Sequence, residues 1–146
     1  MSEQREKTVL FLCTGNYYRS RFAECFFNSV ASETGLPWRA TSRGLAVERG
    51  THNIGPMAKS AIASLENRGL RGSEDLKRFP VQLAPADLET AHLIVALKQV
   101  EHLPLLRERF PAWADKVEFW HIDDAPGVLG LIEQEVAELA ARLRTM

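Results

Sequence analysis

A thiol and a guanidinium group stand close together in the segment Cys13–Ser20, which has the pattern C-x5-R-S. Five residues separate Cys13 from Arg19, and a loop of this length can wrap into a cradle whose backbone N–H groups point inward. Such a cradle at the start of a helix attracts an oxyanion, and Arg19 can bind two of its oxygens at once. The residues expected to contact the bound anion are Thr14, Gly15, Asn16, Tyr17, Tyr18, Arg19 and Ser20.

Cys13 is the candidate nucleophile of this loop. A cysteine beside an arginine and a helix N-terminus is expected to carry a thiolate near neutral pH, and Ser20 can donate a hydrogen bond to it. A thiolate beneath a bound phosphate ester is placed for in-line attack, while the loop donors stabilise the equatorial oxygens of the transition state. This chemistry requires neither a metal nor a cofactor. Gly15 and Asn16 tolerate a positive φ, which we expect the cradle to use.

The elements on both sides of the loop are expected to hold it in place. Thr8–Leu12 is a short continuous apolar run, typical of a strand buried on both faces of a parallel sheet. From Arg19 onward apolar residues recur every four positions as far as Thr34, which predicts a helix that ends at a left-handed Gly35. The thiol therefore lies at the end of a strand and the guanidinium at the start of a helix.

The rest of the chain continues the alternation of strands and helices. Further strands are predicted at Trp38–Ser42, His92–Leu97 and Lys116–Trp120. Further helices are predicted at Pro56–Gly69, Pro85–Thr90, Gln99–Arg109 and from Gly127 to the C-terminus. This order predicts a doubly wound α/β fold with a four-stranded parallel sheet and flanking helices. In such sheets ligands bind beyond the carboxyl ends of the strands, which is where the loop stands.

The overall composition bounds the class of protein. The 146 residues fit one domain, residues 1–146, and 18 basic against 19 acidic side chains leave a net charge of −1. This balance argues against nucleic acid or a membrane surface as a partner, so an anion must meet a local site. Two cysteines favour a reduced, cytoplasmic setting, and we recognise no targeting signal. Cys25 lies among phenylalanines of the first helix and is interpreted as an inert buried thiol.

The sequence resembles the low-molecular-weight protein tyrosine phosphatase family over nearly its whole length. The resemblance is carried by VLFLCTGNYYRSRFAE (Val9–Glu24) and by the segments Thr41–Gly44, Asp87–Val95 and Val117–Asp124. It implies a flavodoxin-like fold with strand order 2-1-3-4 and a cysteinyl-phosphate mechanism without a metal. It also implies that Cys13 is the nucleophile, that Arg19 binds phosphate, and that an aspartate of a late loop is the general acid.

The late loop departs from the family pattern, in which Asp-Pro is followed by aromatic residues. Here the run is WHIDDAPG (Trp120–Gly127). Counting from the tryptophan places Asp124 at the acid position and Ala125 at the position of the proline, and Asp123 is the alternative acid. Because the aromatic residues are missing, we expect a more open rim around the pocket.

Other positions also differ from the family pattern. Tyr18 stands where many relatives carry a second cysteine that forms a reversible disulfide with the nucleophile, and Arg21 stands where a proline follows Arg-Ser. Ser42 matches a serine that supports the loop asparagine, but no histidine is found for the third position of that network. We therefore expect Asn16 to be held less firmly. The histidines are interpreted as surface or strand-end residues: His52, His92, His102 and His121.

Several activities fit a phosphate-binding loop of this kind. The leading hypothesis is hydrolysis of an aryl phosphate, on a phosphorylated protein or a small molecule, with Tyr17 and Tyr18 as walls for the ring. Relatives specific for phosphoarginine resemble the loop but tend to carry a small threonine where Tyr17 stands. An arsenate reductase coupled to a small thiol needs only Cys13. A catalytically impaired protein that binds inorganic phosphate or another oxyanion is the remaining alternative.

Overall fold

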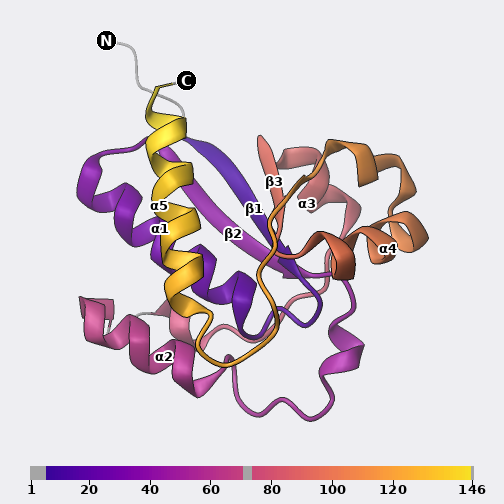
Figure 1. The fold of residues 1–146 in the computed structure, drawn as a ribbon, viewed down its shortest axis with the longest axis horizontal. Coiled ribbons are helices and arrows are strands. Elements are labelled where there is room, and N and C mark those ends of the chain that lie inside the picture. The colour runs from indigo at the N-terminus through magenta and orange to yellow at the C-terminus, as the bar shows by residue number, and fades with distance from the viewer. Residues whose placement is uncertain (1–5, 71–73, 146) are drawn as a thin grey trace.

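The computed structural model of the chain describes residues 6–70 and 74–145. Figure 1 shows helices on both sides of a twisted sheet. The strands are β1 (Lys7–Cys13), β2 (Trp38–Gly44), β3 (Leu93–Ala96) and β4 (Glu118–Phe119). The α-helices are α1 (Arg19–Thr34), α2 (Lys59–Leu65), α3 (Pro85–Thr90), α4 (Gln99–Arg109) and α5 (Leu129–Arg144).

The four strands form one parallel sheet in the order β2-β1-β3-β4, which confirms the predicted fold and strand order. Successive residues of β1 point to opposite faces. Val9 and Phe11 join a buried cluster with α1, α2 and α5, whereas Leu10 and Leu12 join a second cluster with α3 and α4. Both faces of β1 are therefore covered, which explains its continuous apolar sequence.

The predicted elements are present, but several have different bounds. β1 and β2 extend beyond the predicted Thr8–Leu12 and Trp38–Ser42, and α5 begins at Leu129 and not at Gly127. The predicted helix Pro56–Gly69 is wrong at both ends, because Ala58 is extended with ψ 134° and a single π-helical turn with φ +91° at Gly69 follows α2. The predicted strand His92–Leu97 is confined to β3. The predicted strand Lys116–Trp120 is confined to β4, because a 3-10 turn occupies the chain up to Lys116.

Helix α1 fixes the far side of the loop. It begins at Arg19 and ends as predicted, with Gly35 at φ +69° and its N–H bonded to the carbonyl of Ala31. Its buried face contacts β1, β2 and α5. The loop that contains Cys13 is thus anchored between a central strand and a packed helix.

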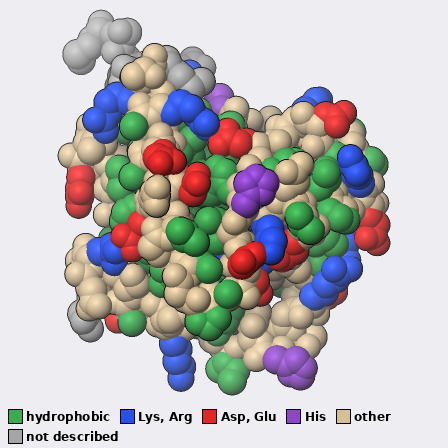
Figure 2. Space-filling view, in the orientation of Figure 1, with side chains coloured by type: hydrophobic (Ala, Val, Ile, Leu, Met, Phe, Trp, Pro, Cys, Tyr) green, Lys and Arg blue, Asp and Glu red, His purple; other side chains and the backbone are tan. Residues whose placement is uncertain are grey.

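The surface carries charges of both signs. Figure 2 shows basic and acidic side chains intermixed over the face that is drawn, in keeping with the net charge of −1. In the described ranges, none of the helices has the length and apolar character needed to cross a membrane.

Candidate active site

The loop 13–20 wraps around the thiol of Cys13. The backbone N–H of Asn16 points to Cys13 Sγ at 3.3 Å, and Ser20 Oγ lies 2.9 Å from the same sulfur. The predicted contact between Ser20 and Cys13 is therefore present.

Asn16 provides the left-handed turn of the loop. Its φ is +52°, as predicted, and asparagine is one of the few residues that tolerate this conformation. Gly15 does not have a positive φ, so that part of the prediction is wrong. A single left-handed residue is enough to curl the chain around the sulfur.

The side chain of Asn16 makes hydrogen bonds at both of its ends. Its amide nitrogen donates to Ser20 Oγ and to Ser42 Oγ, both at 2.9 Å. Its carbonyl oxygen accepts from the backbone N–H of Val81 at 3.0 Å and from Arg78 at 3.2 Å. Ser42 supports Asn16 as expected, but the expectation that Asn16 is held less firmly is wrong, because Arg78 and Val81 supply the further partners.

Arg78 and Glu24 extend this support below the loop. Arg78 donates to Glu24 at 2.8 Å and to Ser42 Oγ at 3.0 Å, and Ser42 donates to Glu24 at 2.5 Å. Arg21 donates to the backbone carbonyls of Arg78 and Pro56, at 2.5 and 3.0 Å. Arg21 occupies the position at which the family pattern has a proline. Its side chain is fully buried and fixes the segment that carries Arg78.

The end of β2 approaches the loop closely at Gly44. The backbone N–H of Leu45 donates to the carbonyl of Cys13 at 2.9 Å. A Cβ at Gly44 would lie 2.8 Å from the carbonyl oxygen of Thr14 and 2.6 Å from a methyl carbon of Val47. Only glycine fits here without displacing the backbone of the loop.

Arg19 is buried, and its guanidinium group is held from two directions. One terminal nitrogen donates to the carbonyl of Ile122 at 3.0 Å, and the other donates to Glu101 at 2.7 Å. Burial alone would lower the pKa of Arg19, but the bond to Glu101 and the surrounding negative groups raise it. A guanidinium carries five N–H groups, so three remain to bind an oxyanion.

The two aspartates of the late loop face different partners. Asp124 lines the pocket above Cys13, and its Oδ1 lies 3.7 Å from Nε of Arg19. Asp123 forms an ion pair with Lys98, which lowers the pKa of Asp123. Of the two candidates, Asp124 is the one placed beside the loop.

The pocket above Cys13 has a volume of about 180 Å³ and lies beside a second cavity of about 330 Å³. Tyr17, Tyr18, Asn53 and Asp124 line both spaces. The hydroxyl of Tyr17 donates to the carbonyl of Ile54 at 2.6 Å, which ties its ring to the segment after β2. Arg49, Gly50 and Asn53 also line the pocket, although the sequence analysis did not single them out.

Glu101 and His102, at the start of α4, form a second group that the sequence analysis missed. Glu101 accepts hydrogen bonds from Arg19 and from the hydroxyl of Thr14. His102 is completely buried, so its interpretation as a surface or strand-end residue is wrong. The residue stands three and four positions before Leu105 and Leu106, on the buried face of α4, and this helical spacing was a signal for its burial.

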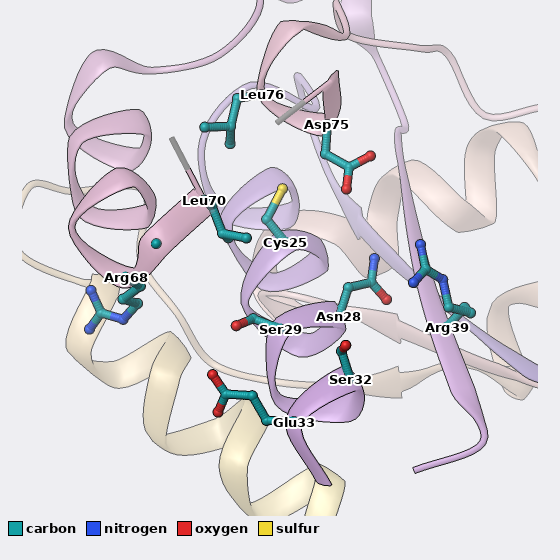
Figure 3. Close-up of a pocket in the computed structure, with 11 residues that line it drawn as sticks. Cys25, Asn28, Ser29, Ser32, Glu33, Arg39, Arg68, Leu70, Asp75 and Leu76 are labelled. Atoms are coloured by element: carbon teal, nitrogen blue, oxygen red, sulfur yellow. The ribbon is translucent and has the colours of Figure 1, made fainter. Parts of the chain in front are cut away.

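Cys25 borders a separate cavity of about 350 Å³, which Figure 3 shows between α1, the turn after α2 and β2. This cavity and the pocket above Cys13 share no lining residue. Burial raises the pKa of Cys25 to about 12, which agrees with the predicted inert thiol. Within residues 6–70 and 74–145, no cluster of three metal-ligating side chains occurs.

Comparison with known proteins gives matches over most of the chain. The family model described as "Low molecular weight phosphotyrosine protein phosphatase" matches residues 8–145. The structure of a low molecular weight protein tyrosine phosphatase from T. tengcongensis is 26% identical, with a TM-score of 0.73, and the match covers 96% of this chain and 99% of that chain.

Two curated relatives carry names that describe other activities. A protein-arginine-phosphatase of Bacillus subtilis is 28% identical over 109 residues, which cover 75% of this chain and 67% of the relative. Arsenate reductase 1 of Staphylococcus haemolyticus is 28% identical over 125 residues, which cover 84% of this chain and 80% of the relative. These relatives thus match most of the chain and differ in the activity for which they are named.

Proposed function

The chain belongs to the low-molecular-weight phosphotyrosine protein phosphatase family, and from this premise we propose that it hydrolyses phosphotyrosine esters through a cysteinyl-phosphate intermediate. The observation that carries the proposal is the geometry around Cys13. Its sulfur faces two hydrogen-bond donors and opens into a pocket lined by Arg19, Asp124 and two tyrosines. The groups that we propose as nucleophile, anion clamp, proton donor and aromatic walls thus surround one small space.

The proposed reaction has two steps. In the first, Cys13 Sγ forms a bond to phosphorus while the P–O bond to the phenol breaks, and Asp124 donates its proton to the leaving oxygen. In the second, water attacks phosphorus and gives a proton to Asp124, and the S–P bond breaks with its electron pair returning to sulfur. Arg19 and the N–H groups of loop 13–20 stabilise the equatorial oxygens in both steps.

The walls of the pocket favour an aryl phosphate as substrate. Tyr17 and Tyr18 line both the pocket and the neighbouring cavity, so a phosphotyrosine ring entering above the loop meets aromatic surface. Phosphoarginine is the competing substrate, because one relative is named for it. Relatives specific for phosphoarginine tend to carry a small threonine where Tyr17 stands, so the tyrosine in this chain favours the aryl ester.

Arsenate reduction is the second candidate activity, since one relative carries that name. Arsenate has the shape and charge of phosphate and fits the same cradle. Cys13 and Cys25 are the only cysteines in the sequence, and Cys25 is buried away from the pocket. A reductase built on this chain would therefore require a small thiol from solution to complete each turnover.

Steady-state assays on the purified chain separate these activities. We expect hydrolysis of p-nitrophenyl phosphate and of a phosphotyrosine peptide, with a higher kcat/KM for the peptide than for a phosphoarginine peptide of the same sequence. Cys13→Ser should abolish turnover while still binding inorganic phosphate, because a hydroxyl cannot replace the thiolate. Faster hydrolysis of phosphoarginine, or arsenate reduction with a small thiol in place of ester hydrolysis, would contradict the proposal. Phosphate binding without any turnover would identify a catalytically impaired relative.

A further inference from the structure

The carboxylate of Glu101 lies where the side chains of Thr14, Arg19 and His102 converge. Its Oε2 accepts a hydrogen bond from Thr14 Oγ1 and one from Arg19 at 2.7 Å, and it lies 3.1 Å from Nε2 of His102. Burial opposes the ionisation of Glu101, but the neighbouring His102, Arg19 and Thr14 outweigh it and hold the pKa of this carboxyl well below its usual range. Glu101 is therefore a carboxylate throughout the physiological pH range.

His102 supports the carboxylate from inside the protein. Its Nδ1 accepts the backbone N–H of Lys98 at 3.0 Å, so the proton of the neutral ring is on Nε2, which faces Glu101. The ring is completely buried, and burial lowers the pKa of His102. A neutral imidazole in this tautomer lies against the carboxylate, with Nε2 3.1 Å from Oε2, and adds no charge beside Arg19.

Glu101 stands behind the loop, outside the set of residues that line the pocket. Together with the carbonyl of Ile122, it holds both terminal nitrogens of Arg19. These two acceptors fix the plane of the guanidinium group and leave its remaining N–H groups for an oxyanion. The hydrogen bond to Thr14 joins the residue after the nucleophile to the same carboxylate.

From this arrangement we infer that Glu101 is a positioning residue for the phosphate cradle, with His102 as its buried support. It sets the orientation of Arg19 and of Thr14 relative to Cys13, and it acts through them without contacting the substrate. The inference deepens the proposed function, because the cradle that it positions is the proposed binding site for the phosphoryl group. Supporting residues of this kind matter because catalysis depends on sub-ångström placement of the groups that bind the transition state.

Glu101→Asp tests the inference without changing the net charge. The shorter side chain places the carboxylate about 1.5 Å farther back, beyond simultaneous reach of Thr14 and Arg19. We expect kcat for p-nitrophenyl phosphate to fall about tenfold and the dissociation constant of inorganic phosphate, measured by calorimetry, to rise at least about threefold. Glu108→Asp is the matched control, because Glu108 is an exposed residue of the same helix. It should match the parent protein in both measurements.

The outcomes are distinct. If Glu101→Asp matches the Glu108→Asp control in turnover and in phosphate binding, the positioning role is wrong. If Glu101→Asp loses its cooperative thermal transition, Glu101→Met replaces it, since the side chain has a similar length but its thioether is a poor acceptor for the hydrogen bonds of Arg19 and Thr14. Unchanged turnover in that variant overturns the inference. A parent protein that binds phosphate but hydrolyses nothing contradicts the proposed function, and the comparison of dissociation constants then still decides the role of Glu101.

Discussion

If Asp124 protonates the leaving group, its removal should slow the hydrolysis of phosphotyrosine far more than that of p-nitrophenyl phosphate. A tyrosine hydroxyl has a pKa near 10 and leaves poorly as an anion, so it depends on the donated proton. A positioned general acid contributes about 10²–10⁴-fold, which corresponds to roughly 3–5 kcal/mol of the barrier. The p-nitrophenolate ion is a better leaving group and needs this contribution less.

Other consequences of Asp124→Ala are expected to be small. The side chain is 68% exposed, and exposed substitutions change the free energy of unfolding by about 0.5 kcal/mol or less. Its ion pair with Arg19, at 3.7 Å, is worth at most about 1 kcal/mol at such an exposed site. Loss of the acid should therefore appear in kcat for phosphotyrosine, with little change in thermal stability or in phosphate binding.

Asp123→Ala is the matched control for this experiment. Asp123 is the adjacent residue, is 67% exposed and carries the same functional group, but it pairs with Lys98. Since Lys98 lowers the pKa of Asp123, that carboxyl stays ionised at neutral pH and has no proton to donate. The measurement is kcat for a phosphotyrosine peptide and for p-nitrophenyl phosphate in both variants. A selective loss in Asp123→Ala, with parent-like behaviour of Asp124→Ala, would refute the assignment.

Three further predictions follow from the site. Arg19→Lys should lower kcat/KM more than tenfold, or ~1.4 kcal/mol, because an ammonium cannot bind two oxygens in a fixed plane, and a smaller loss would contradict the clamp role. Mild peroxide should give Cys13 oxoacids by mass spectrometry, since burial raises the pKa of Cys25 to about 12, and a Cys13–Cys25 disulfide as the main product would disprove this. Burial lowers the pKa of His102, so the unfolded chain binds a proton that the folded chain does not, and the free energy of unfolding should fall below pH 6.5. His102→Gln should flatten that decline in urea denaturation at pH 5–8, and an unchanged slope would contradict it.

The loop 13–20 and its flanking elements were predictable because the residues that determine them are neighbours in the sequence. Cys13 and Arg19 lie in one contiguous segment, and the periodicity of the apolar residues changes from that of a strand to that of a helix across it. The glycine at the end of α1 was predictable for the same reason, since only the residues around Gly35 decide the cap. Each of these features depends on residues within one or two turns of chain.

The supporting residues were not predictable, because they reach the loop from distant parts of the sequence. Glu101 is 82 positions from Arg19, and Arg78 is 62 positions from Asn16. An isolated glutamate or arginine on an otherwise polar segment has no spacing that distinguishes it from an exposed side chain. The role of Glu101 follows from the strand order. This order brings the carboxyl ends of β1 and β3 together and places the start of α4 behind the loop.

Tyr18 and Ala125 both depart from the family pattern, and the two residues contact each other in the structure. Ala125 removes the constraint that a proline would place on the late loop, and Tyr18 removes a cysteine next to Arg19. The hydroxyl of Tyr18 donates to the carbonyl of Ala125 at 3.3 Å, so the residue that replaces the cysteine also ties the late loop to the cradle. Asp124, one position before Ala125, is thereby held beside the pocket by a hydrogen bond instead of by a proline ring. Position 18 thus offers no thiol for a disulfide with Cys13, and the tyrosine there provides a tether for the proposed acid.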